Sequence, residues 1–217
     1  MKLVFLGSLF IVFYVLANIL AIKKIDIGPL VVTAGLLTFP ITFLLTDVIN
    51  EVWGKIVAQK IVLYGFAIMA FVLGIIQLAI WIPPASFWVE EQEHFAHFFR
   101  GTFRITLASF CAFLVSQLHD VWAFDFWGKK TKGKHLWIRN NFSTIASQAI
   151  DSVIFVGIAF GGVLPISVLW SMVLGMWIIK WIIAILDTPF CYLLVRWAQK
   201  DSQGVNIDDG RPLKRWA

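Results

Sequence analysis

Residues 56–82, IVAQKIVLYGFAIMAFVLGIIQLAIWI, form an apolar run in which Lys60 is the one charged residue. A helix of this length rises about 1.5 Å per residue, which is enough to cross the roughly 30 Å of hydrocarbon in a bilayer. Five further apolar runs have the same interpretation, and they cover residues 3–22, 30–49, 103–122, 142–163 and 166–197. The sequence therefore predicts an all-α polytopic membrane protein with six transmembrane helices.

The composition agrees with a membrane protein. Of the 217 residues, 59% are apolar and 14% are charged, and the mean hydropathy is +0.82. A soluble domain has about 25% charged residues, so the composition excludes a cytosolic enzyme, a disordered chain and a disulfide scaffold. Cys111 and Cys191 both lie inside apolar runs. We expect them to be small buried hydrophobic residues and not a disulfide or a metal site.

The distribution of lysine and arginine predicts the orientation. Most of them precede the first run, follow the second and fourth runs, or lie in the tail. Because cytoplasmic loops carry the excess of basic residues, both termini should be cytoplasmic. Residues 1–200 then form a single six-helix transmembrane domain, and residues 201–217 form a polar cytoplasmic tail. The net charge of +5 indicates this topology and contact with anionic lipid, and no nucleic acid partner is expected.

Two local alternatives accompany this topology. The first apolar run could be a signal peptide, but it is longer than the usual apolar region of one and five more spans follow. The segment after the third run carries Glu90, His94 and His97, and the two histidines have a spacing that could hold a metal on a helix. Because no third ligand is specified, we expect an exposed polar loop and no metal.

The fifth run carries polar side chains at membrane depth. They recur at steps of three and four residues, which places them on one face of a helix: Asn141, Thr144, Gln148 and Asp151. A charged group at the centre of a membrane helix costs about 2.5 to 3.5 kcal/mol, so Asp151 needs compensation. The antiparallel sixth run brings Lys180 to a similar depth, and we predict an ion pair between the two. Asp187 lies on the same face as Lys180, about two turns nearer the cytoplasm.

The second and fourth runs each end in a cluster of polar and aromatic side chains. The clusters are Asp47, Asn50, Glu51 and Trp53 in the former, and Gln117, His119, Asp120 and Trp122 in the latter. Pro40 should remove one hydrogen bond of the second helix, and the resulting kink either helps to build a substrate site or serves packing alone. No nucleotide-binding P-loop, metalloprotease motif or hydrolase motif occurs, so no enzymatic activity is expected.

Four segments resemble one bacterial family. These are residues 37–43 (LTFPITF), 46–55 (TDVINEVWGK), 116–125 (SQLHDVWAFD) and 139–144 (RNNFST), the last followed by Ser147, Gln148 and Asp151. In combination they resemble the queuosine precursor transporters, inner-membrane proteins that are grouped with the vitamin uptake transporters. The resemblance implies an importer of 7-cyano-7-deazaguanine, 7-aminomethyl-7-deazaguanine or queuine for queuosine salvage into tRNA, with secondary transport as the favoured mechanism. The alternative is the substrate-capturing membrane subunit of an energy-coupling-factor type transporter, driven by a separate ATPase.

The candidate residues match the chemistry of such a ligand. A deazaguanine has a flat face and an edge with two N–H donors beside one acceptor, which suits carboxylates, amides and stacking rings. The candidates are Asp47, Asn50, Glu51, Trp53, Gln117, His119, Asp120, Trp122, Asn140, Asn141, Thr144, Gln148 and Asp151. Several of them could instead form interhelical hydrogen bonds or an interfacial aromatic belt. Asp151, Lys180 and Asp187 are candidates for ion coupling. No cofactor is expected, and the aromatic surface is compatible with lipid or with a homodimer.

Overall fold

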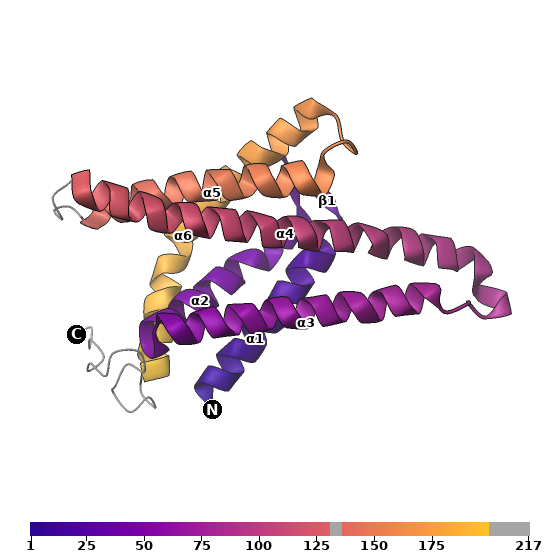
Figure 1. Cartoon of the computed structure of the whole chain (residues 1–217), viewed down its shortest axis with the longest axis horizontal. Helices are drawn as coiled ribbons and strands as arrows, with labels where there is room; N and C mark the ends of the chain where they lie inside the picture. Colours follow the sequence, from indigo (N-terminus) through magenta and orange to yellow (C-terminus); the bar gives the residue numbers. More distant parts are fainter. Residues whose placement is uncertain (131–135, 200–217) are drawn as a thin grey trace.

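The computed structural model describes residues 1–130 and 136–199, and helices dominate them (Figure 1). The α-helices are α1 Lys2–Leu20, α2 Phe39–Trp53, α3 Lys55–Trp81, α4 Val89–Lys130, α5 Leu136–Phe160 and α6 Ile166–Gln199. Two short 3-10 helices, η1 Ala34–Leu37 and η2 Ser86–Trp88, and two strands, β1 Lys24–Ile27 and β2 Leu30–Thr33, complete the described elements.

Several helices have the length and apolarity needed to cross a membrane. Among the described residues these are Lys2–Leu20, Ile56–Trp81, Ser86–Ser116 and Ile166–Ile183, while the apolar stretch Ile145–Phe160 is shorter. Large apolar side chains such as Phe71 and Trp81 are exposed, as expected for a surface that meets lipid. The prediction of a helical membrane protein is confirmed. The six spans and the cytoplasmic termini stay predictions.

The helix predicted for residues 30–49 is wrong in its first half. Residues 30–37 form β2 and η1, and the helix begins only at Phe39. A two-residue turn at Gly28 and Pro29 pairs β2 with β1 in an antiparallel hairpin, and Gly28 has the positive φ of 59° that such a turn requires. Val31, Val32 and Thr33 are β-branched, which suits a strand.

Pro40 lies in the first turn of α2 and does not kink the helix. Its missing N–H has no cost there, because the first N–H groups of a helix lack intrahelical partners. At 15 residues, α2 rises roughly 22 Å. It ends at Trp53, and the φ of 92° at the following Gly54 allows the chain to turn directly into α3.

The hairpin packs against α6. The Val31 backbone N–H donates to Ser171 Oγ at 3.1 Å, and Ser171 Oγ donates to the Pro29 carbonyl at 3.2 Å. Gly175 allows this close approach, since a Cβ there would lie 3.0 Å from the Val31 carbonyl oxygen. On β1, the ammonium of Lys24 lies 4.7 Å from the centre of the Phe160 ring, and partial burial lowers the pKa of Lys24.

Helix α4 is longer than the fourth predicted span at both ends. The predicted polar loop around Glu90, His94 and His97 is helical and forms the first turns of α4. Glu90 and Glu91 lie in the first turn, where negative charge favours a helix. At its other end α4 continues to Lys130, and it packs along α5 over much of its length (Figure 1).

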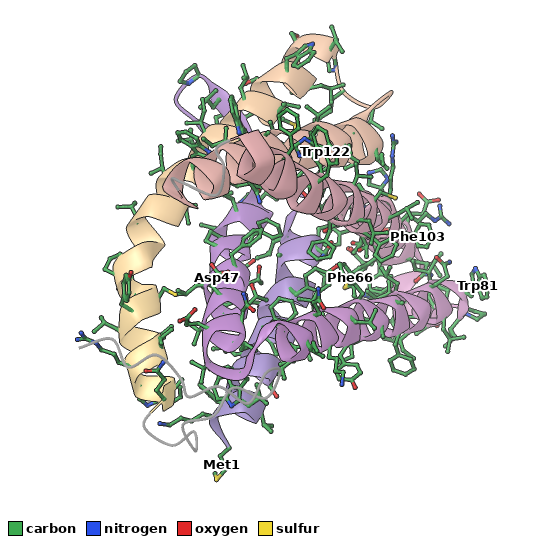
Figure 2. The ribbon with its side chains drawn as sticks, turned by 60° about the vertical axis from the view of Figure 1, so that its left-hand side comes forward. Met1, Asp47, Phe66, Trp81, Phe103 and Trp122 are labelled. Atoms are coloured by element: carbon green, nitrogen blue, oxygen red, sulfur yellow. The ribbon has the colours of Figure 1, made fainter. Side chains whose placement is uncertain are left out.

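The buried apolar side chains form two clusters. The first joins α1, α2 and α3 to the end of α6 and includes Phe10, Leu45 and Met69. The second joins α4, α5 and α6 and includes Phe155 and Met172. Helix α6 reaches both clusters; it continues through Pro189, and Figure 2 shows it curved along its length.

Candidate functional site

A cavity of about 140 Å³ lies where the two apolar clusters meet. An apolar cavity of about 150 Å³ in another protein accepts a benzene molecule, so this space suits a small flat ring. Its lining comes from β2, η1 and all six α-helices. The polar lining residues are Tyr14, Asn18, Thr33, Thr42, Thr46, Ser109, Ser116, Gln148, Asp151 and Lys180, and the other aromatic ones are Phe10, Phe39, Phe43, Phe66, Phe113 and Phe155.

The predicted ion pair is confirmed in the lining of this cavity. Lys180 Nζ donates to Asp151 Oδ2, and the two side chains are 7% and 14% exposed. The ammonium also lies 5.2 Å from the centre of the Phe39 ring, within the range of a cation–π contact. Each charge thus has a partner in surroundings where an unpaired charge would be expensive.

A short turn after α5 brings these two residues to the same depth. Residues 161–165 connect α5 to α6, with Gly162 at a φ of 75°. Arg104 on α4 holds this corner, because its guanidinium donates to the carbonyls of Ile158, at 2.6 Å, and Gly161. These carbonyls have no partner within α5, so the arginine satisfies the end of the helix. In the sequence, Arg104 is one of the few basic residues that lie outside the predicted cytoplasmic segments, and nothing there indicates this role.

Gln148 lies one turn before Asp151 on α5 and also lines the cavity. Its Oε1 atom is buried and has no hydrogen-bond partner among the described residues. Most buried polar atoms in proteins have a partner, so such an atom beside a cavity needs an explanation. Gln148 therefore offers an available acceptor next to the ion pair.

Helix α1 supplies a part of the lining that the sequence analysis missed. Tyr14 and Asn18 are 6% and 4% exposed, and the Asn18 amide donates to the Tyr14 carbonyl at 2.9 Å. Their only signal in the sequence is a phenol and an amide within an apolar run. The predicted site lay between the second, fourth, fifth and sixth spans, whereas the cavity also includes α1 and α3.

The polar cluster at the end of α2 does not line the cavity. Asp47, Asn50 and Glu51 are exposed on α2, where Figure 2 labels Asp47. Trp53 packs against the first apolar cluster. Thr46, which directly precedes Asp47 on α2, does line the cavity, but its hydroxyl donates to carbonyls of its own helix.

In the polar cluster on α4, the described side chains of His119 and Trp122 are also outside the cavity lining. His119 Nδ1 lies 3.0 Å from Ser147 Oγ, which links α4 to α5. Trp122 is 61% exposed and stacks on Phe126. The side chains of the remaining candidates lie outside the described residues: Gln117, Asp120, Asn140, Asn141, Thr144 and Asp187. Of the predicted substrate-binding residues, the structure brings Gln148 and Asp151 to the cavity, together with Lys180.

Comparison with known proteins gives consistent matches. Residues 33–194 match the family model described as "Putative vitamin uptake transporter". A "Probable queuosine precursor transporter" of Bacillus subtilis is 29% identical over 190 residues, which cover 87% of this chain and 82% of the relative. A protein of the same name from Haemophilus influenzae is 34% identical over 59% of this chain and 52% of its own. The "Queuosine precursor transporter" of Escherichia coli is 30% identical over 59% of this chain and 55% of its own.

No solved structure matches the chain. The family model nevertheless covers well over half of the sequence, and the three relatives carry concordant names. The chain therefore belongs to the family described as "Putative vitamin uptake transporter".

Proposed function

We propose that this protein imports queuosine precursors across the bacterial inner membrane for salvage into tRNA. The substrates are 7-cyano-7-deazaguanine, 7-aminomethyl-7-deazaguanine or queuine. The names of the relatives support this class of substrate. The observation that carries the proposal is the buried Gln148 Oε1, which has no hydrogen-bond partner in the described part of the chain and lies beside the Asp151–Lys180 pair in a cavity with aromatic walls.

The chemistry of the cavity suits the edge of a deazaguanine. The two N–H donors of that edge can be accepted by Gln148 Oε1 and by the Asp151 carboxylate, whose Oδ2 is engaged by Lys180. The Gln148 amide can also donate to the adjacent carbonyl oxygen of the ligand. Rings such as Phe39 and Phe43 can cover the flat face of the heterocycle.

The predicted topology has six crossings with both termini in the cytoplasm. Helix α2 alone is short for a crossing, so the second crossing would consist of β2, η1 and α2 together. Non-helical backbone is tolerated at membrane depth where protein buries it or where it lines a cavity. The contribution of η1 to the lining supports this arrangement, and interrupted helices recur at transporter sites.

The ion pair offers a way to couple import to the proton gradient. Protonation of Asp151 would remove its charge and release Lys180, which would change the cavity in one half of the transport cycle. Alternating exposure of the cavity to the two sides would then carry the ligand inward. In the alternative, a separate ATPase drives a capturing subunit, and that ATPase would purify together with this chain.

The test uses cells that cannot synthesise the base and lack their own importer. Such cells receive a low external concentration of each of the three substrates, and queuosine in tRNA is measured. Wild type should restore queuosine, whereas Gln148→Leu should lower initial uptake about tenfold, because a buried hydrogen bond to the ligand is lost. Gln77→Leu is the matched control, since Gln77 is partly buried on α3 and is outside the cavity lining.

Membrane abundance of each variant is measured in parallel. No queuosine from well-expressed wild type with any of the three substrates would contradict import. Uptake that persists at its full rate after the proton gradient is collapsed would contradict proton coupling. Dependence of uptake on a co-purifying ATPase would support the alternative.

A further inference from the structure

The hydroxyl of Tyr14 is a buried polar group that makes no hydrogen bond of normal geometry with the residues that the structure describes. The residue lies on α1, is 6% exposed and lines the cavity. The side chains of Asn18 and Ser109 lie close enough to interact with this hydroxyl, but neither forms a well-aligned hydrogen bond with it. The same cavity contains the unpartnered Oε1 atom of Gln148.

The ring of Tyr14 is held firmly by its neighbours. It stacks on Phe10, with centroids 5.9 Å apart, and meets the Phe66 ring edge-on at 5.3 Å. A phenylalanine would make the same ring contacts without burying a hydroxyl. A buried hydroxyl without a partner destabilises a fold, so packing gives no reason for tyrosine at this position.

We propose that the Tyr14 hydroxyl is a hydrogen-bonding contact of the transported ligand, so that α1 contributes a specificity-determining residue to the site. This inference rests on the proposed import function. The ligand would place one polar group of its edge at the Tyr14 hydroxyl and another at the Gln148 amide. Both protein groups are neutral, and the charged lining residues Asp151 and Lys180 neutralise each other. The site therefore selects a flat heterocycle whose edge is polar and uncharged.

The experiment compares Tyr14→Phe with Tyr64→Phe. Tyr64 lies on α3, is 59% exposed and is outside the cavity lining, so it controls for loss of a phenol hydroxyl. Uptake is measured as restored queuosine in tRNA, and the Kd of 7-cyano-7-deazaguanine is measured on purified protein. Tyr14→Phe should weaken uptake and binding about tenfold, the effect of one lost hydrogen bond. Tyr64→Phe should leave both unchanged.

Thermal stability distinguishes a ligand contact from a structural role. Removal of an unpartnered buried hydroxyl should leave the Tm of the purified Tyr14→Phe protein equal to or above that of wild type. A lower Tm, or uptake and Kd equal to wild type, would overturn the proposal for Tyr14 while import itself stood. Absence of both import and binding in wild type would overturn the proposed function instead.

Discussion

In the Asp151–Lys180 pair, each charge offsets the free-energy cost of burying the other. Each side chain is largely buried, and each would be an uncompensated charge without the other. Removal of one partner of a buried pair typically costs about 3 to 5 kcal/mol, whereas replacing both can be nearly neutral. We therefore expect the pair to behave as one unit in stability and in transport.

Exchange of the two charges tests this unit. Asp151→Lys alone and Lys180→Asp alone each place two like charges together, and each should abolish import and reduce the amount of protein in the membrane. The double exchange restores opposite charges at the same positions and should retain more import than either single variant. Uptake and membrane abundance of all three variants provide the measurement. A double variant no better than the single ones would show that the pairing does not matter for transport.

The residues of the site differed in how well the sequence predicted their roles. Gln148, Asp151 and Lys180 were predictable, because polar residues at helical spacing within apolar runs have few other interpretations. Tyr14 was not, since one phenol in an apolar helix is ordinary and its burial depends on helices far away in sequence. Arg104 was missed for a similar reason, because its carbonyl partners lie at the end of another helix.

At the scale of elements, the apolar runs predicted where regular structure lies better than they predicted whether it is a helix or a strand. Helices α3 and α6 begin and end within a few residues of the predicted spans, because long apolar runs interrupted by polar turns leave little choice. Residues 30–37 were assigned to the wrong structure. A short β-branched apolar stretch fits a strand or a helix equally, and the choice depended on pairing with β1 and docking on α6.

The docking of the hairpin on α6 predicts opposite effects for two helical glycines. Alanine favours a helix interior over glycine by about 1 kcal/mol. At Gly74 on α3 a new methyl meets nothing within 4 Å, so Gly74→Ala should be neutral or stabilising. At Gly175 the methyl would lie 3.0 Å from the Val31 carbonyl oxygen and from Val32 Cγ1, so the hairpin must move. Gly175→Ala should lose roughly 1 to 3 kcal/mol of stability.

Thermal unfolding of the purified Gly74→Ala and Gly175→Ala proteins in detergent checks these two effects. The Tm of Gly175→Ala should fall below that of wild type, and its import should fall as well, because η1 follows the displaced strand into the cavity lining. Equal Tm values for the two alanine variants would show that the hairpin tolerates displacement at no cost.

At the scale of the whole molecule, the connections fall into two groups. Figure 1 shows the start of α1 and the junction of α2 with α3 towards one end, and η2 and the α5–α6 turn towards the other. The Lys2 ammonium donates to the Trp197 carbonyl at 2.5 Å, which places the end of α6 beside the start of α1. This grouping is what an even number of crossings requires, and the basic residues favour the first group as the cytoplasmic one.

Cysteine labelling tests that orientation. In a chain with Cys111→Ala and Cys191→Ala, a single cysteine is introduced either at Phe87 or at Gln59. Phe87 is 88% exposed in η2, and Gln59 is exposed in the first turns of α3. A membrane-impermeant maleimide should label Phe87→Cys in intact spheroplasts and label Gln59→Cys only after permeabilisation. Because residues 60–81 of α3 separate the two positions, labelling of both from the same side would mean that α3 does not cross the membrane. The reverse pattern would invert the molecule and place its basic connections outside.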